Sequence, residues 1–586
     1  MFRATCRHIA NGLNRYCLDQ HVGNMLMAIF IGALSAYGAL LFQEMLRGSQ
    51  FLFYQHRGDV LDFYHDLKAW QVVGLPALGG LLVGLIVRFG ASEAKGHGVP
   101  EVMTALAMHG GRIRKRVALV KIMASAVCIG SGGSSGREGP MVQIGSSIGS
   151  SIGQFFKVNL MKQRTMVGCG AAAGIAATFN APIAGVLFAL EILVGDFGLT
   201  SFTPVVLSSV TATAISRYYW GDLPAFELPI YKIVSLWEFG LFPLLGLAAA
   251  LAAVAFVSIL YKAEDLFEAL PIPEWTKPPL GGLGLGLILL YWPHGFGVGY
   301  GSMNLALLDQ MPGMLMLTLI FVKIAATSLT LGSGGSGGIF APSLFIGAMT
   351  GGFFGWCVNM LFPGLTASPG AYALIGMGAV VAGTTHASIT AILIIFEMTA
   401  NYKIILPMMI TCIIAHTVAS SLRRGSIYTI KLHRRGIDIA GGYEQNILRS
   451  LRVSRFMDAK VTTVPESMPL KNIIETFKKL DASYLHVLDA KGDLSGIISF
   501  RDIRGLLEEE GLHYLVIARD VATRDLAVIR PDDTIKKAMR LFSDRNISQL
   551  PVVGGDTGRK VLGQLREKDV VSAYDKAVVR RELESA

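Results

Sequence analysis

Long apolar stretches alternate with short polar segments over the first 435 residues of the chain. The longest are Met25–Phe42, Val72–Val87, Phe239–Leu260 and Met314–Leu331, and each approaches the roughly 20 residues that a helix needs to cross a bilayer. Other apolar stretches are shorter, or are broken by Gly and Pro. Interrupted segments in matching places of two halves are typical of transporters that bind substrate near the bilayer midplane. The pattern predicts a helical protein that crosses the membrane several times, rather than a large soluble enzyme.

One segment of this region occurs twice. Residues 120–140 read VKIMASAVCIGSGGSSGREGP and residues 322–342 read VKIAATSLTLGSGGSGGIFAP, with 11 identical positions at an offset of 202. A second pair, NAPIAGVLFALE at 180–191 and HASITAILIIFE at 386–397, has an offset of 206. Two repeats at nearly the same offset predict duplicated halves, which could be parallel or inverted. Each Gly-rich turn leaves backbone N–H groups unpaired beside a helix start, a place that attracts anions.

The pattern changes near residue 435, where charges become frequent and the periods shorten. We expect a linker over 436–456, because this part of the chain has no apolar period. Two similar units follow within 457–586, at about 457–515 and 519–575. Each reads strand, helix, strand, strand, helix, beginning with VTTVP at 461–465 in one and LAVIRP at 526–531 in the other. This pair resembles a tandem CBS module.

Composition supports a membrane protein. Charged residues make up 16% of the chain, hydrophobic residues 52%, and the mean hydropathy is +0.50, whereas a soluble domain carries about 25% charged residues. The net charge of +10 is explained by basic clusters that mark cytoplasmic sides, without a nucleic-acid partner. The clusters are Arg3, Arg7 and Arg15; Arg112, Arg114, Lys115 and Arg116; and Arg423 and Arg424. The six cysteines include no CxxC pair, so we interpret them as packing residues, and we expect no cleaved leader.

Glu138, in the sequence GREGP, is the first candidate functional residue. It lies on a Gly/Ser turn at a predicted helix start, between sequences apolar enough to lie within a membrane. A carboxylate there is costly unless it faces water or finds donors, and the turn supplies donors. The residue at the equivalent position of the second repeat is Phe340, so the fold itself does not need a carboxylate. A carboxylate bound at an anion site competes with the anion, and would act as a pH-dependent gate. The alternative is a structural role, in which the carboxylate only caps its own helix.

Over residues 20–435 the chain resembles the CLC family of chloride channels and proton-coupled chloride transporters. The shared motifs are GHGVPE at 96–101, GSGGSSGREGP at 130–140, FNAPIAGVLFALE at 179–191, GGIFAP at 337–342 and SIYTI at 426–430. The resemblance implies an all-α polytopic membrane protein with inverted repeats, at about 20–220 and 230–430 within a domain of residues 1–435. It also implies a homodimer, with the tandem CBS module as an α/β cytoplasmic tail.

The resemblance assigns roles motif by motif. Glu138 matches the gating glutamate, and the backbone N–H groups around Arg137–Gly139 match the outer anion site. The backbone N–H groups of Ile339 and Phe340 match the central site, and the Tyr428 hydroxyl matches its inner donor. Neutral donors of this kind bind chloride weakly enough to release it. Outside this motif context, Tyr428 alone would be interpreted as an interfacial tyrosine.

Two positions depart from the family pattern. His97 of GHGVP stands where the family usually has a serine that lines the anion path. His97 is either a satisfied structural residue or a pathway residue that tunes selectivity or pH response. Ile192 stands where proton-coupled members often have a second glutamate, directly after the position of Glu191. An isoleucine cannot carry a proton, which favours passive conduction, although some family transporters also lack this glutamate.

Other charged positions are duplicated between the halves. We interpret Glu191 and Glu397 as structural groups that pair with backbone donors, and Lys121 and Lys323 as buried partners of carboxylate or carbonyl groups. In the tail, Ser499 with Asp502, and Asp569 in the second unit, match the positions that bind a nucleotide ribose in CBS pairs. Arg566 replaces the hydroxyl residue of the second unit, so an intact adenosine pocket is in doubt, and the alternative is a regulatory or assembly module without a ligand.

These features predict a chloride-transporting membrane protein, with Glu138 as the gate and passive conduction favoured over proton/chloride antiport. A CBS-regulated cation transporter would need more carboxylates in the apolar segments, and no nucleophile–base pair or metal cluster suggests an enzyme. We expect no cofactor beyond a possible adenine nucleotide in the tail. The expected partners are chloride, the lipid bilayer and a second copy of the chain, with protons as a further partner in the antiport alternative. We expect a multi-pass protein of the cell inner or plasma membrane, with both termini in the cytoplasm.

Overall fold

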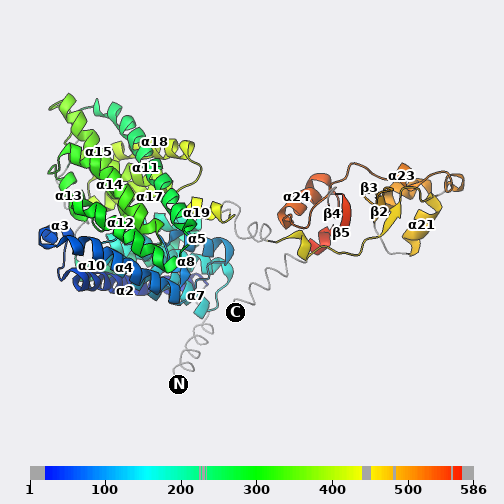
Figure 1. Cartoon of the computed structure of the whole chain (residues 1–586), viewed down its shortest axis with the longest axis horizontal. Coiled ribbons are helices and arrows are strands. Elements are labelled where there is room, and N and C mark those ends of the chain that lie inside the picture. The colour runs from blue at the N-terminus through cyan, green and yellow to red at the C-terminus, as the bar shows by residue number, and fades with distance from the viewer. Residues whose placement is uncertain are drawn as a thin grey trace, which may run out of the picture. The chain divides into compact units, whose positions relative to one another are not determined.

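The chain forms two compact units, Met1–Ile439 and Ala440–Ala586. The structure, a computed structural model, describes residues 20–222, 226, 231, 234–437, 451–479, 484–507, 509–555 and 559–570. The expected basic cluster at Arg3–Arg15, two of the cysteines (Cys6 and Cys17) and most of the expected linker lie outside the described residues. Figure 1 shows helices throughout the first unit, and both strands and helices in the second.

The first half of the membrane unit is a series of helices that begins with a long apolar one. They are α2 (Gln20–Tyr54), α3 (Val60–Phe63), α4 (Ala69–Phe89), α5 (Val99–Met108), α6 (Arg116–Gly130), α7 (Glu138–Phe155), α8 (Leu160–Phe179), α9 (Pro182–Phe188) and α10 (Leu199–Trp220). A π-helical segment, Ala189–Val194, continues α9. In Figure 1, α2, α4, α7 and α10 lie in the lower part of this unit.

The second half repeats this series. Its helices are α11 (Glu238–Ala269), α12 (Lys277–Tyr291), α13 (Tyr300–Leu307), α14 (Gly313–Gly332), α15 (Phe340–Leu361), α16 (Pro369–Thr385), α17 (Ser388–Thr399), α18 (Ile405–Leu422) and α19 (Thr429–Arg434). The helices α11, α15 and α18 lie in the upper part of the unit in Figure 1. All four of the longest apolar stretches in the sequence fall inside helices, namely α2, α4, α11 and α14, as predicted.

Several of these helices are suited to a bilayer. Among the described residues, six helical segments are long and apolar enough to cross a membrane: Val22–Tyr54, Ala69–Phe89, Glu238–Ala269, Gly313–Gly332, Phe340–Leu361 and Tyr402–Leu422. Others, such as α5, α9 and α17, are apolar but shorter. Helices too short to cross a bilayer are tolerated in a membrane protein where other helices or a polar site receive their ends.

The two halves are inverted relative to each other. The Glu191 carboxylate, at the end of the first-half motif, accepts a hydrogen bond from the Thr390 N–H at the start of α17 (2.8 Å). The Glu397 carboxylate at the end of α17 accepts one from the Ala184 N–H at the start of α9 (2.7 Å). Because each helix is capped by the far end of the other, α9 and α17 run antiparallel. The relation between equivalent helices therefore reverses the direction of one half, as the resemblance implied.

Matching glycines bring neighbouring helices into backbone contact in both halves. A Cβ on Gly145 of α7 would lie 2.0 Å from the Gly170 carbonyl oxygen of α8. A Cβ on the equivalent Gly347 of α15 would lie 2.4 Å from the Gly376 oxygen of α16. Between membrane helices, where lipid is as apolar as leucine, small residues of this kind allow the close packing that drives association. The helices that carry the repeated motifs are thus held rigidly in both halves.

The tail contains two small sheets. In one, β1 (Thr463–Pro465) pairs in parallel with β2 (Tyr484–Leu488), which pairs in antiparallel with β3 (Leu494–Ser499). In the other, β4 (Gln549–Gly554) pairs in antiparallel with β5 (Lys560–Arg566). The helices are α21 (Leu470–Lys479), α22 (Phe500–Ile503), α23 (Ala518–Val521) and α24 (Ile535–Arg545). Leu470, Ile473, Ile474 and Phe477 recur at helical spacing and are all buried.

Two details of the tail differ from the prediction. The expected strand at 526–531 is reduced to a single bridge between Ile529 and Val552. The next N–H, that of Arg530, bonds to the Asp533 side chain (2.9 Å), and Pro531 has no N–H to donate, so the ladder ends there. The second difference is at the end of the expected linker, where the Val453 N–H bonds to the Asp533 carbonyl (3.0 Å). Residues from 451 onward therefore pack as part of the tail.

Candidate functional site

Three Gly-rich turns meet at the centre of the membrane unit. Gly136 and Gly338, which are equivalent in the two repeats, exchange backbone hydrogen bonds: the Gly136 N–H donates to the Gly338 oxygen (2.8 Å), and the Gly338 N–H to the Gly136 oxygen (2.6 Å). The turn around Gly96 joins them, since its N–H donates to the Gly335 oxygen (2.9 Å). The two copies of the Ser/Gly tract, far apart in sequence, thus form one structure.

Helix starts converge on these turns. The helix α7 begins at Glu138 and α15 begins at Phe340, so their first N–H groups have no acceptor within the helix. The predicted anion-binding N–H groups, those of Arg137–Gly139 and of Ile339 and Phe340, belong to these two turns. The N–H groups and the helix dipoles together form an environment that favours a negative charge.

The Glu138 carboxylate occupies this environment. The side chain is 1% exposed, and its Oε1 accepts a hydrogen bond from the Tyr300 hydroxyl (3.2 Å). Its Oε2 has no hydrogen-bond partner among the described residues. The Ala341 backbone N–H, in the first turn of α15, also lies near the carboxylate. A carboxylate of the first half is therefore held between helix starts of both halves, which is more than a cap for its own helix.

The Arg137 side chain turns away from the anion-binding turn. Its guanidinium donates to the Gln43 side-chain oxygen (2.9 Å) and lies over the Tyr300 ring, 5.3 Å from the centroid. Arg137 and Tyr300 line a cavity of about 240 Å³, together with Asn180, Asn304 and others. The sequence prediction missed Tyr300 and Gln43. A comparison of the loop before α13 with the loop before α5 would have pointed to Tyr300.

Tyr428 and His97 lie together at the other predicted end of the site. Tyr428 is 1% exposed and its ring centroid is 6.0 Å from that of His97. His97 is 4% exposed, and neither ring nitrogen has a partner among the described residues. A satisfied structural histidine would be hydrogen-bonded, so the geometry favours the interpretation of His97 as a pathway residue.

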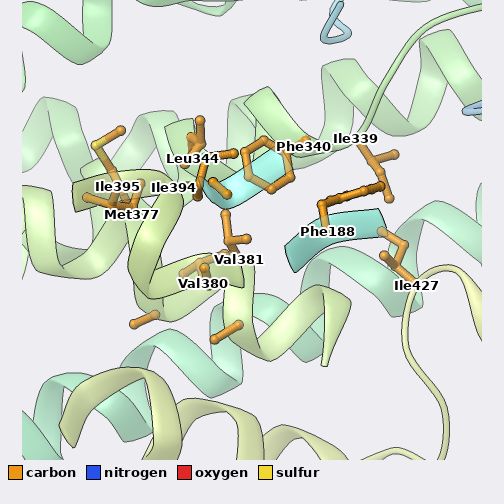
Figure 2. Packing of buried hydrophobic residues seen from close by; sticks show 14 of the residues in the cluster. Phe188, Ile339, Phe340, Leu344, Met377, Val380, Val381, Ile394, Ile395 and Ile427 are labelled. Atoms are coloured by element: carbon orange, nitrogen blue, oxygen red, sulfur yellow. The ribbon is translucent and has the colours of Figure 1, made fainter. Parts of the chain in front are cut away.

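Apolar side chains surround the space between the two ends. Phe188, Ile339, Phe340 and Ile427 belong to one buried apolar cluster, part of which Figure 2 shows. The Ile427 N–H donates to the Thr384 oxygen (2.9 Å), and the Ile427 oxygen accepts from the Tyr261 hydroxyl (2.6 Å). These bonds fix the turn that carries Tyr428. Apolar walls leave the backbone donors as the polar groups that a small anion would meet.

The duplicated lysines hold equivalent loops. The Lys121 ammonium donates to the carbonyls of Ala94 (3.0 Å) and Gly96 (2.7 Å). The Lys323 ammonium donates to the carbonyl of Gly297 (2.8 Å), among others. Both lysines are 0% exposed. The prediction that they are buried partners of carbonyl groups is confirmed. The prediction that Glu191 and Glu397 pair with backbone donors is also confirmed, because both carboxylates accept hydrogen bonds from backbone N–H groups.

Ile192 is half-buried and packs against the apolar core.

In the tail, both candidate ribose-binding carboxylates are engaged within the protein. The Asp502 carboxylate accepts from the N–H (2.7 Å) and the hydroxyl (2.8 Å) of Ser499, which caps α22. Asp569 forms an ion pair with Arg566 (3.1 Å), and Arg566 also pairs with Asp458 (2.7 Å). These contacts favour the interpretation that the second unit lacks an open ribose site. Among the described residues, no group of three His, Cys, Asp or Glu side chains could hold a metal ion.

Comparison with known proteins places this geometry in a family. Residues 79–420 match the family described as "Voltage gated chloride channel", and residues 453–509 and 518–576 match "CBS domain". A putative chloride channel protein, ClcB-like, of Ralstonia nicotianae is 35% identical over 70% of this chain and 96% of its own. An H(+)/Cl(-) exchange transporter, ClcA, of Vibrio cholerae is 39% identical over 60% of this chain and 76% of its own. The crystal structure of a slow cyanobacterial Cl-/H+ antiporter aligns with a TM-score of 0.64 at 28% identity, covering 72% of this chain and 99% of that one.

Proposed function

Because this chain belongs to the voltage-gated chloride channel family, or CLC family, we propose that it moves chloride across a membrane through a pathway gated by Glu138. The observation that carries the proposal is the position of this carboxylate, which is buried between the first turns of α7 and α15. The N–H groups that surround it suit a chloride ion equally well. The ionised carboxylate excludes the anion, and a protonated or displaced side chain admits it.

The remaining site residues take roles along this path. The N–H groups of Arg137–Gly139 form the outer site, and those of Ile339 and Phe340 form the central site. The Tyr428 hydroxyl, with His97 beside it, serves the inner end. All of these donors except a protonated His97 are neutral, so they hold chloride without trapping it.

Substitution of Glu138 by glutamine tests the gate. The amide has nearly the same shape but no charge, so Glu138→Gln should carry chloride at neutral pH and should lose most of its pH dependence. Chloride efflux from liposomes between pH 4.5 and 8.5 measures both effects. The matched control is Glu44→Gln, which removes an exposed carboxylate that pairs with Arg47. Steep acid activation of Glu138→Gln would refute the assignment.

Passive conduction is the favoured mode. Ile192 is apolar and half-buried, and it stands where proton-coupled relatives of the family often have a glutamate. The side chain at this position cannot carry a proton between the cytoplasm and Glu138. A chloride gradient imposed on liposomes should then cause no uphill proton movement, as recorded by an internal pH-sensitive dye.

A second candidate, proton/chloride exchange, is favoured by a histidine pair. The rings of His386 and His416 stack with centroids 5.3 Å apart, and the His416 Nδ1 is hydrogen-bonded to the Ser388 hydroxyl (2.8 Å). Ser388 begins α17, whose next N–H groups bind Glu191, the neighbour of Ile192. An imidazole ring can accept a proton on one nitrogen and release one from the other, so we propose this pair as the replacement for the missing carrier. Proton uptake at a fixed ratio to chloride, which is lost in His386→Leu, would establish exchange and refute passive conduction.

Membership of the family supports a proposal for the assembly and placement of the chain. We propose a homodimer in the cell inner or plasma membrane, with the Tyr428 end and both termini toward the cytoplasm. The proposed tail is a regulatory or assembly module. Mass measurement of the purified protein in detergent tests the dimer, and protease access to the tail in sealed vesicles tests the orientation.

A further inference from the structure

The residue that donates a hydrogen bond to Glu138, Tyr300, lies outside the sequence motifs shared with the family. The Tyr300 hydroxyl donates to the Glu138 Oε1 across 3.2 Å, and the two residues are 162 positions apart. Tyr300 is the first residue of α13, in the second half, whereas Glu138 belongs to the first. The contact therefore ties the proposed gate of one half to the framework of the other.

The framework around Tyr300 fixes the direction of its hydroxyl. Lys323 donates to the carbonyls of Gly295, Gly297 and Val298, at 3.3, 2.8 and 3.2 Å, and so clamps the loop before α13. The Asp59 carboxylate accepts from the Gly301 N–H (2.8 Å), which holds the first turn of the helix from the other side.

The ring of Tyr300 is enclosed as well. It packs against Phe226, with centroids 5.7 Å apart, and lies under the Arg137 guanidinium at 5.3 Å. A side chain packed on both sides loses little further freedom when it forms a hydrogen bond. The hydroxyl is thus preorganised toward the closed position of the carboxylate.

The same loop exists in the first half without the hydroxyl. Lys121 binds the carbonyls of Ala94 and Gly96, as Lys323 binds those of Gly295 and Gly297. Both loops then pass through a glycine with positive φ, Gly98 (80°) or Gly299 (89°), before the helix starts. The helix starts at Val99 in the first half and at Tyr300 in the second.

The comparison shows that the fold does not require a tyrosine here. The first half builds the loop with Val99, just as the second half builds its turn with Phe340 in place of Glu138. Of the positions at which the two halves differ, these two, a carboxylate in one half and a hydroxyl in the other, lie in contact. A purely structural tyrosine would have no reason to coincide with the gate.

We propose that Tyr300 is a positioning residue that holds the gate closed by stabilising the ionised Glu138 carboxylate in the anion site. This inference rests on the proposed function of Glu138. When the carboxylate is protonated, it loses its attraction for the donor, and the side chain is released. The other charged groups near Tyr300 are Arg137, whose guanidinium also interacts with the hydroxyl, and Asp59 and Lys323, which bind backbone groups of the loop and helix start.

Tyr300→Phe removes the hydroxyl and keeps the ring. The expected result is a rise in chloride efflux at pH 7.5 of about tenfold, and a shift of the pH of half-activation upward by about one unit, because one unit corresponds to a tenfold change in the proton equilibrium. The sign follows from the donor, which favours the ionised form. The control is Tyr64→Phe, which removes a hydroxyl that bonds the Leu290 carbonyl (3.1 Å), away from Glu138.

The double variant Tyr300→Phe/Glu138→Gln separates this inference from the proposed function. Its efflux should equal that of Glu138→Gln, because the hydroxyl acts only through the carboxylate. An unchanged pH profile in Tyr300→Phe, or an equal rise of efflux in the Glu138→Gln background, would overturn the role of Tyr300 and leave the gate intact. Steep pH activation that persists in Glu138→Gln would instead overturn the gate itself. Size-exclusion profiles of each variant confirm that folded protein is compared.

Discussion

A methyl group at Gly136 should force the gate open. A Cβ built on Gly136 lies 2.1 Å from the Glu138 Oε2, whereas ordinary contacts begin near 3.4 Å. The carboxylate must therefore retreat by more than about 1 Å, and because the Tyr300 hydroxyl is held in place, we expect the 3.2 Å bond to Oε1 to break. The φ angle of Gly136 is not positive, so alanine fits the backbone there. The strain falls on the gate, because its carboxylate is the end of a flexible side chain.

The magnitude follows from the lost bond. A hydrogen bond to a charged group contributes about 1.5–3 kcal/mol, so the closed state should lose that much free energy relative to the open state. The open population should rise roughly 10- to 150-fold, at a factor of ten for each ~1.4 kcal/mol. Chloride efflux of Gly136→Ala at pH 7.5 should approach that of the wild type at acid pH.

The Ala341 Cβ and N also lie near the new methyl group, at 3.0 and 3.1 Å, so a control must separate crowding of the gate from crowding of α15. Glu138→Ala provides it, since this variant has no carboxylate to displace. Gly136→Ala should change efflux little in the Glu138→Ala background. A folded Gly136→Ala protein with the wild-type pH profile would refute the reasoning, and so would an equal effect in both backgrounds.

Three further predictions concern the inner end and the tail. In the Glu138→Gln background, chloride affinity measured by calorimetry should be nearly the same at pH 8 and pH 5, because burial and the nearby Lys431 and Lys121 hold the pKa of His97 well below its usual range and keep the ring neutral; a higher affinity at pH 5 that is absent in His97→Ser would show instead that the ring takes up a proton beside the bound anion. Full-length protein should bind ATP weakly, since Arg566 pairs with Asp569, and Arg566→Ser should strengthen nucleotide binding in equilibrium dialysis; unchanged binding would argue against an occluded ribose site. Burial lowers the pKa of His486, which is 0% exposed with both ring nitrogens unpartnered, so the unfolded tail binds a proton more readily than the folded tail. The tail (residues 440–586) should be fully stable above pH ~6.5, and its free energy of unfolding should fall as the pH drops below that value. The melting temperature of His486→Leu should depend less on pH across the same range. An equal dependence would rule out His486 as the cause.

The sequence predicted the framework of the membrane unit well because its signals are local. Apolar stretches of membrane-spanning length and two repeats at offsets of 202 and 206 are visible without tertiary structure. The motif residues could be placed because Gly-rich turns and helix starts depend on neighbouring residues. The repeats by themselves left the direction of the second half open; the family resemblance implied an inverted half, and the exchanged caps of Glu191 and Glu397 show it.

Contacts between distant residues account for the rest of what the sequence prediction missed. The Tyr300 hydroxyl, the Gln43 amide and the His386–His416 pair meet their partners only through folding. In the tail, a strand-like sequence at 526–531 failed as a strand for a local reason that propensity does not record. The Arg530 N–H is taken by a side chain, and hydrogen-bond competition of this kind is decided by tertiary geometry.

The mutual hydrogen bonds of Gly136 and Gly338 have a consequence for the origin of the molecule. Two equivalent residues that bond to each other must lie on either side of the symmetry axis, so the anion site belongs to neither half alone. If the halves arose by duplication of a shorter gene, its product would have worked as a pair of identical chains inserted in opposite directions. Such a pair would present the same residues to both sides of the membrane. In the present chain the two sides of the path differ, because Glu138 stands opposite Phe340 and Tyr300 opposite Val99 in the two repeats.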